Sequence, residues 1–121
     1  MDKITMSGED YLETIFVLGQ GGDVKSTDVA TTLMVSRPAV NKAVGELVEK
    51  GFIEKESYGR IKLTEKGKEE GKRIYARHEL LHEFLLRIGV SEKTAGIDCC
   101  KIEHFVSEET INCLKEFKNK K

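Results

Sequence analysis

The sequence has little proline, little cysteine and no surplus of charge of either sign. Its 121 residues include one proline and three cysteines, and 20 basic side chains are balanced by 21 acidic ones. With one proline and no Ser/Gly-rich run there is no obvious flexible linker, so two modules, if present, must be joined rigidly. A near-neutral chain is not adapted as a whole to nucleic acid, membrane or polycation, and only the distribution of its charge is informative.

Long apolar stretches and targeting features are also missing. No stretch approaches the roughly 18 apolar residues that cross a bilayer. A signal peptide would have a basic end and an apolar core, but the first twenty positions carry four acids, Asp2, Glu9, Asp10 and Glu13. We therefore expect a cytoplasmic protein with no membrane partner. The number of cysteines is odd, and two of the three (Cys99, Cys100 and Cys113) are adjacent, which is poor geometry for an internal disulfide. Reduced thiols, free or metal-bound, are therefore expected.

Helical periodicity and capping residues define the first half of the chain. Residues Ser7–Gly19 have a candidate N-cap serine, acids in the first turn and apolar residues at helical spacing, which predicts a helix. A short extended piece at Val24–Ser26 and a helix from about Thr27 to Leu33 follow. After a turn of about three residues, Ser36 caps another helix, which ends near Gly51. Two helices joined in this way are typical of a helix-turn-helix.

A β-hairpin is predicted next. Phe52–Glu56 and Ile61–Thr64 alternate apolar and polar residues on either side of a glycine-containing turn, Ser57–Arg60. A helix, a helix-turn-helix and a hairpin in this order predict a winged helix. We assign this DNA-binding domain to residues 1–64.

The second half is predicted to be entirely helical. From Glu65 onward one apolar seam has spacings of four, three, four and three, and it consists of Ile74, His78, Leu81, Leu85 and Ile88. Shorter helices are expected from about Lys93 to Phe105 and from Ser107 into the lysine-rich tail. Three helices of this size bury little alone, so their apolar faces favour a dimer interface. The fold class is therefore mainly α, with a helical metal-binding and dimerisation domain over residues 65–121.

Positive charge is concentrated modestly in the winged helix. Residues 24–68 carry nine basic and six acidic side chains, whereas residues 1–23 carry one basic and five acidic. Recognition helices read bases with their first turns, and small and polar residues there leave room for DNA. We expect double-stranded DNA to be contacted by the recognition helix and the wing through Ser36, Arg37, Pro38, Ala39, Asn41, Lys42 and Arg60. The alternative is a winged helix used for protein contacts, with lysines that only solvate one face.

The strongest chemical signal is the pentapeptide Cys100-Lys101-Ile102-Glu103-His104. Residues i, i+3 and i+4 of a helix point the same way, so a thiolate, a carboxylate and an imidazole would converge. Cys99 shares a face with Glu103 but is turned from His104, which makes Cys100 the better metal ligand.

Two further segments carry metal-binding side chains. Asp10 and Glu13 repeat the i, i+3 spacing on the first helix, and His78 adds an imidazole from the apolar seam. Each part also has a plain structural interpretation, as solvated carboxylates or as a core histidine. Together with a winged helix, the parts favour a metal site.

Three motifs in order resemble the diphtheria toxin repressor family of iron- and manganese-dependent transcriptional regulators, and the similarity covers essentially the whole chain. The motifs are Asp10-Tyr11-Leu12-Glu13, Arg77-His78-Glu79-Leu80-Leu81 and Cys100-x-x-Glu103-His104-x-x-Ser107. The resemblance implies a homodimeric winged-helix repressor of metal-uptake genes that binds its operator when Fe(II) or Mn(II) is plentiful. Longer iron-branch members carry an additional SH3-like β-barrel domain, which we expect this short form to lack.

The resemblance implies a ligand set that is a hybrid of the two branches. Asp10 matches the manganese branch, where the iron branch has methionine, and Cys100 matches the iron branch, where the manganese branch has glutamate. The implied metal ligands are Asp10, Glu13, His78, Cys100, Glu103 and His104. The iron branch has an acid at the position of His82, so His82 is a possible replacement ligand or else a solvated polar residue.

Ligand softness separates the candidate metals. A thiolate favours Fe(II), Co(II), Ni(II) or Zn(II) over Mn(II), whereas the hard carboxylates keep Mn(II) possible. We expect Fe(II), with Mn(II) as the alternative and Zn(II), Co(II) or Ni(II) as substitutes in vitro. Because Asp10 and Glu13 belong to the DNA-binding domain and the other ligands to the helical domain, the inferred switch is a metal that bridges the two.

Two other function classes remain open at the sequence level. Cys99 and Cys100 could sense oxidants in a thiol-based redox-sensing winged-helix regulator. A small metallohydrolase could use the same ligands, but six protein ligands leave little open coordination for substrate and water. We therefore expect no enzyme and no small-molecule substrate.

Overall fold

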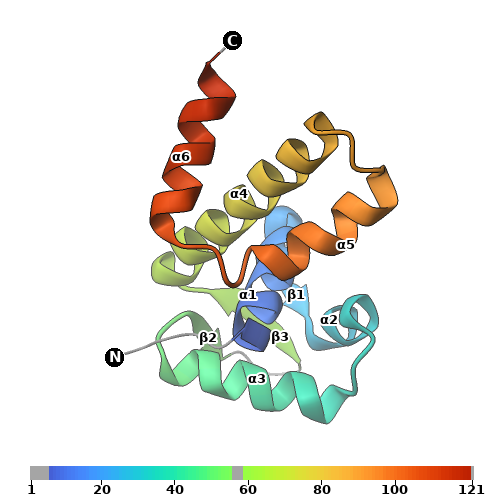
Figure 1. Ribbon diagram of the computed structural model, residues 1–121. Helices are drawn as coiled ribbons and strands as arrows, with labels where there is room; N and C mark the ends of the chain where they lie inside the picture. Colours follow the sequence, from blue (N-terminus) through green and yellow to red (C-terminus); the bar gives the residue numbers. More distant parts are fainter. Residues whose placement is uncertain (1–5, 56–58, 121) are drawn as a thin grey trace. The chain divides into compact units, whose positions relative to one another are not determined.

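The computed structural model describes residues 6–55 and 59–120, which form a mainly helical chain with one small sheet, as expected (Figure 1). Its elements are α1 (Met6–Leu18), the 3-10 turn η1 (Gly19–Gly21), β1 (Val24–Lys25), α2 (Ser26–Leu33), α3 (Arg37–Glu49), β2 (Ile53–Lys55), β3 (Arg60–Leu63), α4 (Glu65–Arg87), α5 (Glu92–Ile102) and α6 (Glu108–Asn119). Across these described ranges, no helix is both long and apolar enough to span a membrane. The chain divides into two compact units, one up to Arg73 and one from Ile74.

The first unit is a winged helix. Its three strands form an antiparallel sheet in the order β1-β3-β2, and Ile61 of β3 pairs with both Val24 and Lys55. The predicted hairpin is β2 and β3, and the extended piece before α2 joins it as a third strand. Periodic apolar side chains of the three helices and β3 fill the core, namely Leu12, Ile15, Val29, Val40, Leu47 and Ile61. Of the predicted turn Ser57–Arg60, residues 57 and 58 lie outside the described residues, and Arg60 begins β3.

The first two turns of α4 pack against this unit at glycines. A Cβ at Gly71 would lie 2.7 Å from the Cβ of Phe16, and one at Gly67 would overlap the carbonyl oxygen of Phe52. Only glycine permits such an approach. The division between the compact units therefore follows Arg73, within α4. The domain boundary after Thr64 stays a prediction.

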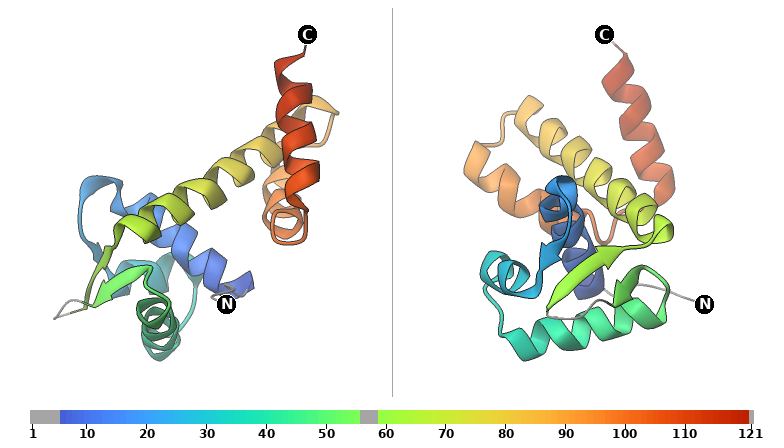
Figure 2. Two further views of the ribbon diagram at one scale, coloured as in Figure 1. Left: turned by 90° about the vertical axis from the view of Figure 1, so that its left-hand side faces the viewer. Right: turned by 180° about the vertical axis from the view of Figure 1, so that it is seen from behind.

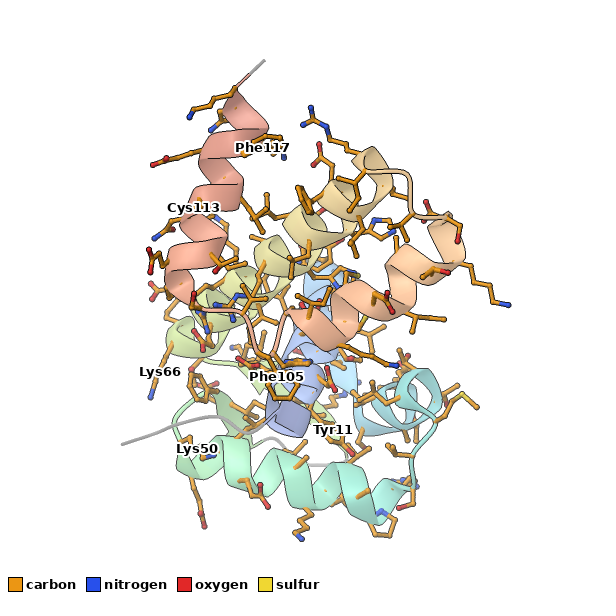
Figure 3. The ribbon with its side chains drawn as sticks, in the orientation of Figure 1. Tyr11, Lys50, Lys66, Phe105, Cys113 and Phe117 are labelled. Carbon is orange, nitrogen blue, oxygen red and sulfur yellow. The ribbon has the colours of Figure 1, made fainter. Side chains whose placement is uncertain are left out.

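The N-terminal end of α4 is also held by a lysine. Lys66 Nζ donates a hydrogen bond to the carbonyl oxygen of Lys50 at 2.8 Å and lies 4.5 Å from the centroid of the Phe52 ring (Figure 3).

The second unit consists of the rest of α4 together with α5 and α6. The end of α4 and α5 lie side by side in opposite directions, with α6 along α4 (Figure 2). Its core contains Leu80, Leu81, Cys99 and Ile111, with Leu85, Ile102, Val106 and Leu114 packed against them. Ser91 and Ser107 accept hydrogen bonds from the N–H groups of Thr94 and Thr110 and so cap α5 and α6.

The apolar seam predicted for α4 includes one residue, Ile88, that lies beyond the end of the helix. Ile88 is 61% exposed, because α4 ends at Arg87 and Gly89 turns the chain at a positive φ of 101°. Only glycine adopts such a φ readily.

Candidate functional site

The recognition helix α3 begins as predicted. Ser36 has extended backbone, and its Oγ accepts a hydrogen bond from the Ala39 N–H at 3.2 Å. Pro38 in the first turn removes an N–H that would have no helical partner. The turn from α2 passes through Met34 in the left-handed region, with φ at 57°.

Most side chains expected to contact DNA lie on one exposed helical turn. Ala39 is half-buried, and the exposed side chains at this end of α3 are Ser36, Arg37, Pro38, Asn41 and Lys42. Val40 and Leu47 of the same helix are buried and attach it to the core. The start of α3 therefore presents polar and cationic groups on a rigid support.

The wing residue Arg60 is exposed but paired. Its Nη1 lies 3.5 Å from Asp23 Oδ2, an ion pair with both side chains about half exposed. Such a surface pair is worth about 0–1 kcal/mol and yields readily to a phosphate. Gly59, beside it, has a φ of 74°, and its carbonyl oxygen accepts a hydrogen bond from the Ser26 N–H at 2.8 Å, which joins the wing to α2.

Asp10 and Glu13 lie one turn apart on α1, both half-buried. The intervening Leu12 is fully buried and fixes the orientation of the helix within the first unit. The two carboxylates therefore share a face, as the spacing predicts.

The helical unit brings the other predicted ligands together around His78 of α4. Its Nδ1 lies 3.8 Å from Cys100 Sγ and 3.5 Å from Glu103 Oε1. Glu103 Oε1 is in turn 3.9 Å from Nε2 of His104. Cys100 and Glu103 thus each lie next to His78, and His104 lies next to Glu103, so the four side chains form a row of neighbours within one unit.

Glu103 shows that this cluster fits a cation. Its side chain is 1% exposed, and neither carboxylate oxygen has a hydrogen-bond partner among the described residues. A buried charge without a partner is costly, and coordination to a metal is one of the few ways to compensate it. The donor set of N, O and S atoms suits a first-row divalent metal.

The helix that carries the Cys-x-x-Glu-His motif ends earlier than predicted. α5 stops at Ile102, and Glu103 is its C-cap with the N–H bonded to Cys99 O at 3.0 Å. Glu103 still follows the helical path, but His104 lies in the turn that leads to α6. The three side chains therefore come together through a helix end and a turn, because the chain must reverse here to reach α6.

Sequence reasoning missed Arg77. Its Nη1 donates to the carbonyl oxygen of Glu103 at 3.0 Å, and its Nη2 donates to Glu108 Oε1 at 2.8 Å. Arg77 therefore positions the turn that carries Glu103 and His104. Its place next to His78 was the available signal, but a contact with a distant backbone oxygen cannot be derived from spacing.

Sequence reasoning also set Cys99 aside as a ligand. Its side chain is fully buried, and its Sγ lies 3.6 Å from His78 Nδ1. Burial first, and then the neighbouring Cys100, raise the pKa of the Cys99 thiol to about 12. Cys99 is therefore a neutral thiol in the metal-free protein.

His82 has a different partner. Its ring is stacked 6.3 Å from that of His78, centroid to centroid, and its Nε2 lies 3.1 Å from Glu92 Oε1. In the part of the chain that the structure describes, His82 belongs to none of the groups of ligand atoms that gather within 4.8 Å.

Comparison with known proteins identifies the family. Residues 3–61 match the N-terminal DNA-binding domain of iron-dependent repressors, and residues 64–120 match their metal-binding and dimerisation domain. An HTH-type transcriptional regulator of Methanocaldococcus jannaschii is 38% identical over 120 residues, which are 97% of this chain and 96% of that protein. The chain belongs to the iron-dependent repressor family. This is the diphtheria toxin repressor family of metal-dependent transcriptional repressors, as the motifs indicated.

The chain is also similar to named metal regulators. The regulator MntR of Lysinibacillus sphaericus is 39% identical over 113 residues, which are 93% of this chain and 81% of MntR. The solved structure of the manganese regulator SloR has a TM-score of 0.81 at 27% identity and covers 93% of this chain. The chain spans about half of SloR, 53% of its length. These relatives are transcriptional regulators, and their membership in a metal-dependent family does not favour the redox-sensor alternative.

Proposed function

We propose that this family member is an Fe(II)-activated repressor that binds operator DNA as a homodimer and controls metal-uptake genes. The observation that carries the proposal is the buried Glu103 carboxylate, which lies between two histidines and has no hydrogen-bond partner among the described residues. A bound divalent ion supplies the positive charge that this carboxylate lacks.

The ligand set has two sources of support. The geometry of the helical unit supports His78, Cys100, Glu103 and His104. The family motif supports Asp10 and Glu13, which share one face of α1, and His82 is kept only as a possible ligand. A set drawn from both domains would make the DNA-binding domain and the helical domain respond together to the metal. The thiol of Cys100 favours Fe(II), and the three carboxylates keep Mn(II) as the alternative.

The start of α3 would read the operator from the major groove. The groove accepts a helix whose first turns carry small and polar residues, and Arg37, Asn41 and Lys42 are exposed there. Arg60 of the wing would contact phosphate and exchange its partner Asp23 for the DNA backbone.

Exposed apolar residues of the helical unit support a homodimer. Ile97, Phe105 and Phe117 are 50%, 79% and 57% exposed, and two of them are labelled in Figure 3. Large apolar side chains that remain exposed are typical of association surfaces. Sedimentation equilibrium is expected to give a dimer, and a monomer at concentrations that saturate DNA would contradict this part of the proposal.

The deciding experiment is an anaerobic titration of chelator-stripped protein with Fe(II), Mn(II) and Zn(II). Fluorescence anisotropy would follow binding to labelled DNA from upstream of the protein's own gene. Activation at the lowest free concentration of Fe(II) is expected, and activation by Mn(II) at an equal or lower concentration would make Mn(II) the regulatory metal. DNA binding that ignores every metal would refute the proposal.

Asp10→Ala tests the ligand taken from the first domain. The variant is expected to dimerise normally but to lose most of the metal dependence of its DNA affinity. Full metal-dependent binding by this variant would show that Asp10 is not a ligand.

A further inference from the structure

The helical unit holds a second group of ligand atoms that only partly overlaps the first. Sγ of Cys99 and Sγ of Cys100 lie 3.6 Å and 3.8 Å from the same atom, His78 Nδ1. The ligand atoms of these three residues all lie within 4.8 Å of one another. Cys99 has no place in the proposed regulatory set, so this trio is not explained by that function.

The two sulfur-to-nitrogen distances of the trio are close to one edge of a zinc tetrahedron. With Zn–S bonds of about 2.3 Å and Zn–N bonds of about 2.0–2.1 Å, a tetrahedral angle places sulfur and nitrogen about 3.6 Å apart. The two S···N distances, 3.6 Å and 3.8 Å, are close to this value. Cys99 Sγ also lies 3.8 Å from His78 Nε2, so the imidazole ring has to turn before Nδ1 can share an ion with both sulfurs.

Access to the trio is from one side. Cys99 is fully buried in the core of the unit, whereas Cys100 is exposed and the His78 side chain is 25% exposed. The Cys99 Sγ also contacts the Gly96 carbonyl oxygen at 3.5 Å, so its position is fixed from within α5. An ion would enter past Cys100 and meet a sulfur already in place.

We propose that His78, Cys99 and Cys100 form a three-ligand site for a soft divalent cation, Zn²⁺ or Cd²⁺, within the helical unit alone. Two thiolates and one imidazole suit these ions and disfavour Mn²⁺. Each thiol loses its proton to solvent on coordination. The fourth position is left to water, since a carboxylate is not part of the group.

The soft site excludes the regulatory site because both need His78 and Cys100. This consequence rests on the proposed function, whereas the soft site itself rests on the geometry of the trio. Occupation by Zn²⁺ or Cd²⁺ would use two ligands of the regulatory set without engaging Asp10 or Glu13.

Cadmium titration of the reduced, metal-free full chain tests the proposal. The ultraviolet sulfur-to-cadmium charge-transfer absorption grows with the number of thiolates bound. Wild type is expected to reach the amplitude of two thiolates per ion, and Cys99→Ser about half of it. Cys113→Ser is the matched control, because Cys113 is exposed on α6 (Figure 3), and it is expected to keep the full amplitude. Full amplitude in Cys99→Ser would overturn the proposal.

A second measurement keeps the test decisive if Cys99→Ser does not fold. Cadmium-113 NMR of the wild-type chain reports the number of sulfur ligands through the chemical shift. A two-sulfur signal that becomes a one-sulfur signal in Cys100→Ser is expected, and a one-sulfur signal in wild type would overturn the site. The cadmium signal is read without DNA, and metal-activated DNA binding is measured without cadmium, so either proposal can fail alone.

Discussion

Replacing Glu103 by Gln is expected to make the metal-free protein more stable than wild type and to remove most of the stability that metal binding adds. The Glu103 side chain is 1% exposed and lacks a hydrogen-bond partner among the described residues. A buried polar group without a partner costs about 1–3 kcal/mol, and a charged one costs more. Glutamine keeps the shape and removes the charge, so we expect the free energy of unfolding in chelator to rise by about 1–3 kcal/mol. The melting temperature should rise by roughly 3–6 °C per kcal/mol.

Metal binding acts in the opposite direction on the stability difference between the two proteins. At a free metal concentration of 100 times Kd, binding adds about 2.7 kcal/mol to the stability of the folded state. A neutral amide is a poor ligand, so Glu103→Gln should lose most of this gain. Urea unfolding in chelator and in saturating Mn(II) measures both effects, with Glu116→Gln, on the exposed surface of α6, as the control that changes neither. A Glu103→Gln protein that is less stable in chelator, or that gains as much from metal as wild type, would refute the reasoning.

Three further predictions concern residues outside the ligand set. Arg77→Lys removes the paired hydrogen bonds to the 103–108 turn, so chelator competition should show metal affinity about 10-fold weaker, and an unchanged Kd would contradict a positioning role. Gly71→Ala should lower the free energy of unfolding by about 1–3 kcal/mol through the overlap with Phe16. Gly45→Ala is the control, because a Cβ at Gly45 has nothing within 4 Å, and it should raise the free energy of unfolding by up to about 1 kcal/mol. Equal urea midpoints for Gly71→Ala and Gly45→Ala would show that the protein relieves the overlap of Gly71→Ala with Phe16. Arg60→Ala should weaken DNA binding evenly across sequences and reduce the slope of log DNA affinity against log salt concentration by about 1. A loss that depends on the DNA sequence would point to base contact by Arg60.

Local sequence patterns predict most of the helices and strands. Ser36 was predicted as a helix cap from its place before an apolar period, and α3 begins there because the cap is a local interaction. The pairing of Val24 with Ile61 was not predictable in the same way, because a strand of two residues has almost no pattern of its own. The division after Arg73 depends on how closely α4 approaches the first unit at Gly67 and Gly71, which spacing within one helix does not show.

The candidate site shows the same limit. The spacing of Cys100, Glu103 and His104 indicates a shared direction. The structure brings Cys100 and Glu103 next to His78, and His104 next to Glu103, even though α5 ends before His104. Cys99 was set aside because it was compared only with neighbours on its own helix. His78 approaches α5 from α4 and contacts both sulfurs, and only the packing of the two helices reveals that face.

The central claim is that metal and operator bind with mutual coupling, and measuring metal affinity with and without operator DNA tests it most directly. Linkage requires DNA to tighten metal binding by the same factor by which metal tightens DNA binding, typically about 5–150-fold. Titration of the wild-type chain with Fe(II) and with Mn(II), alone and saturated with operator, gives the first factor, and titration with operator in chelator and in saturating metal gives the second. Equal factors well above one for the regulatory metal are expected. Metal affinity that is the same with and without DNA would contradict the account.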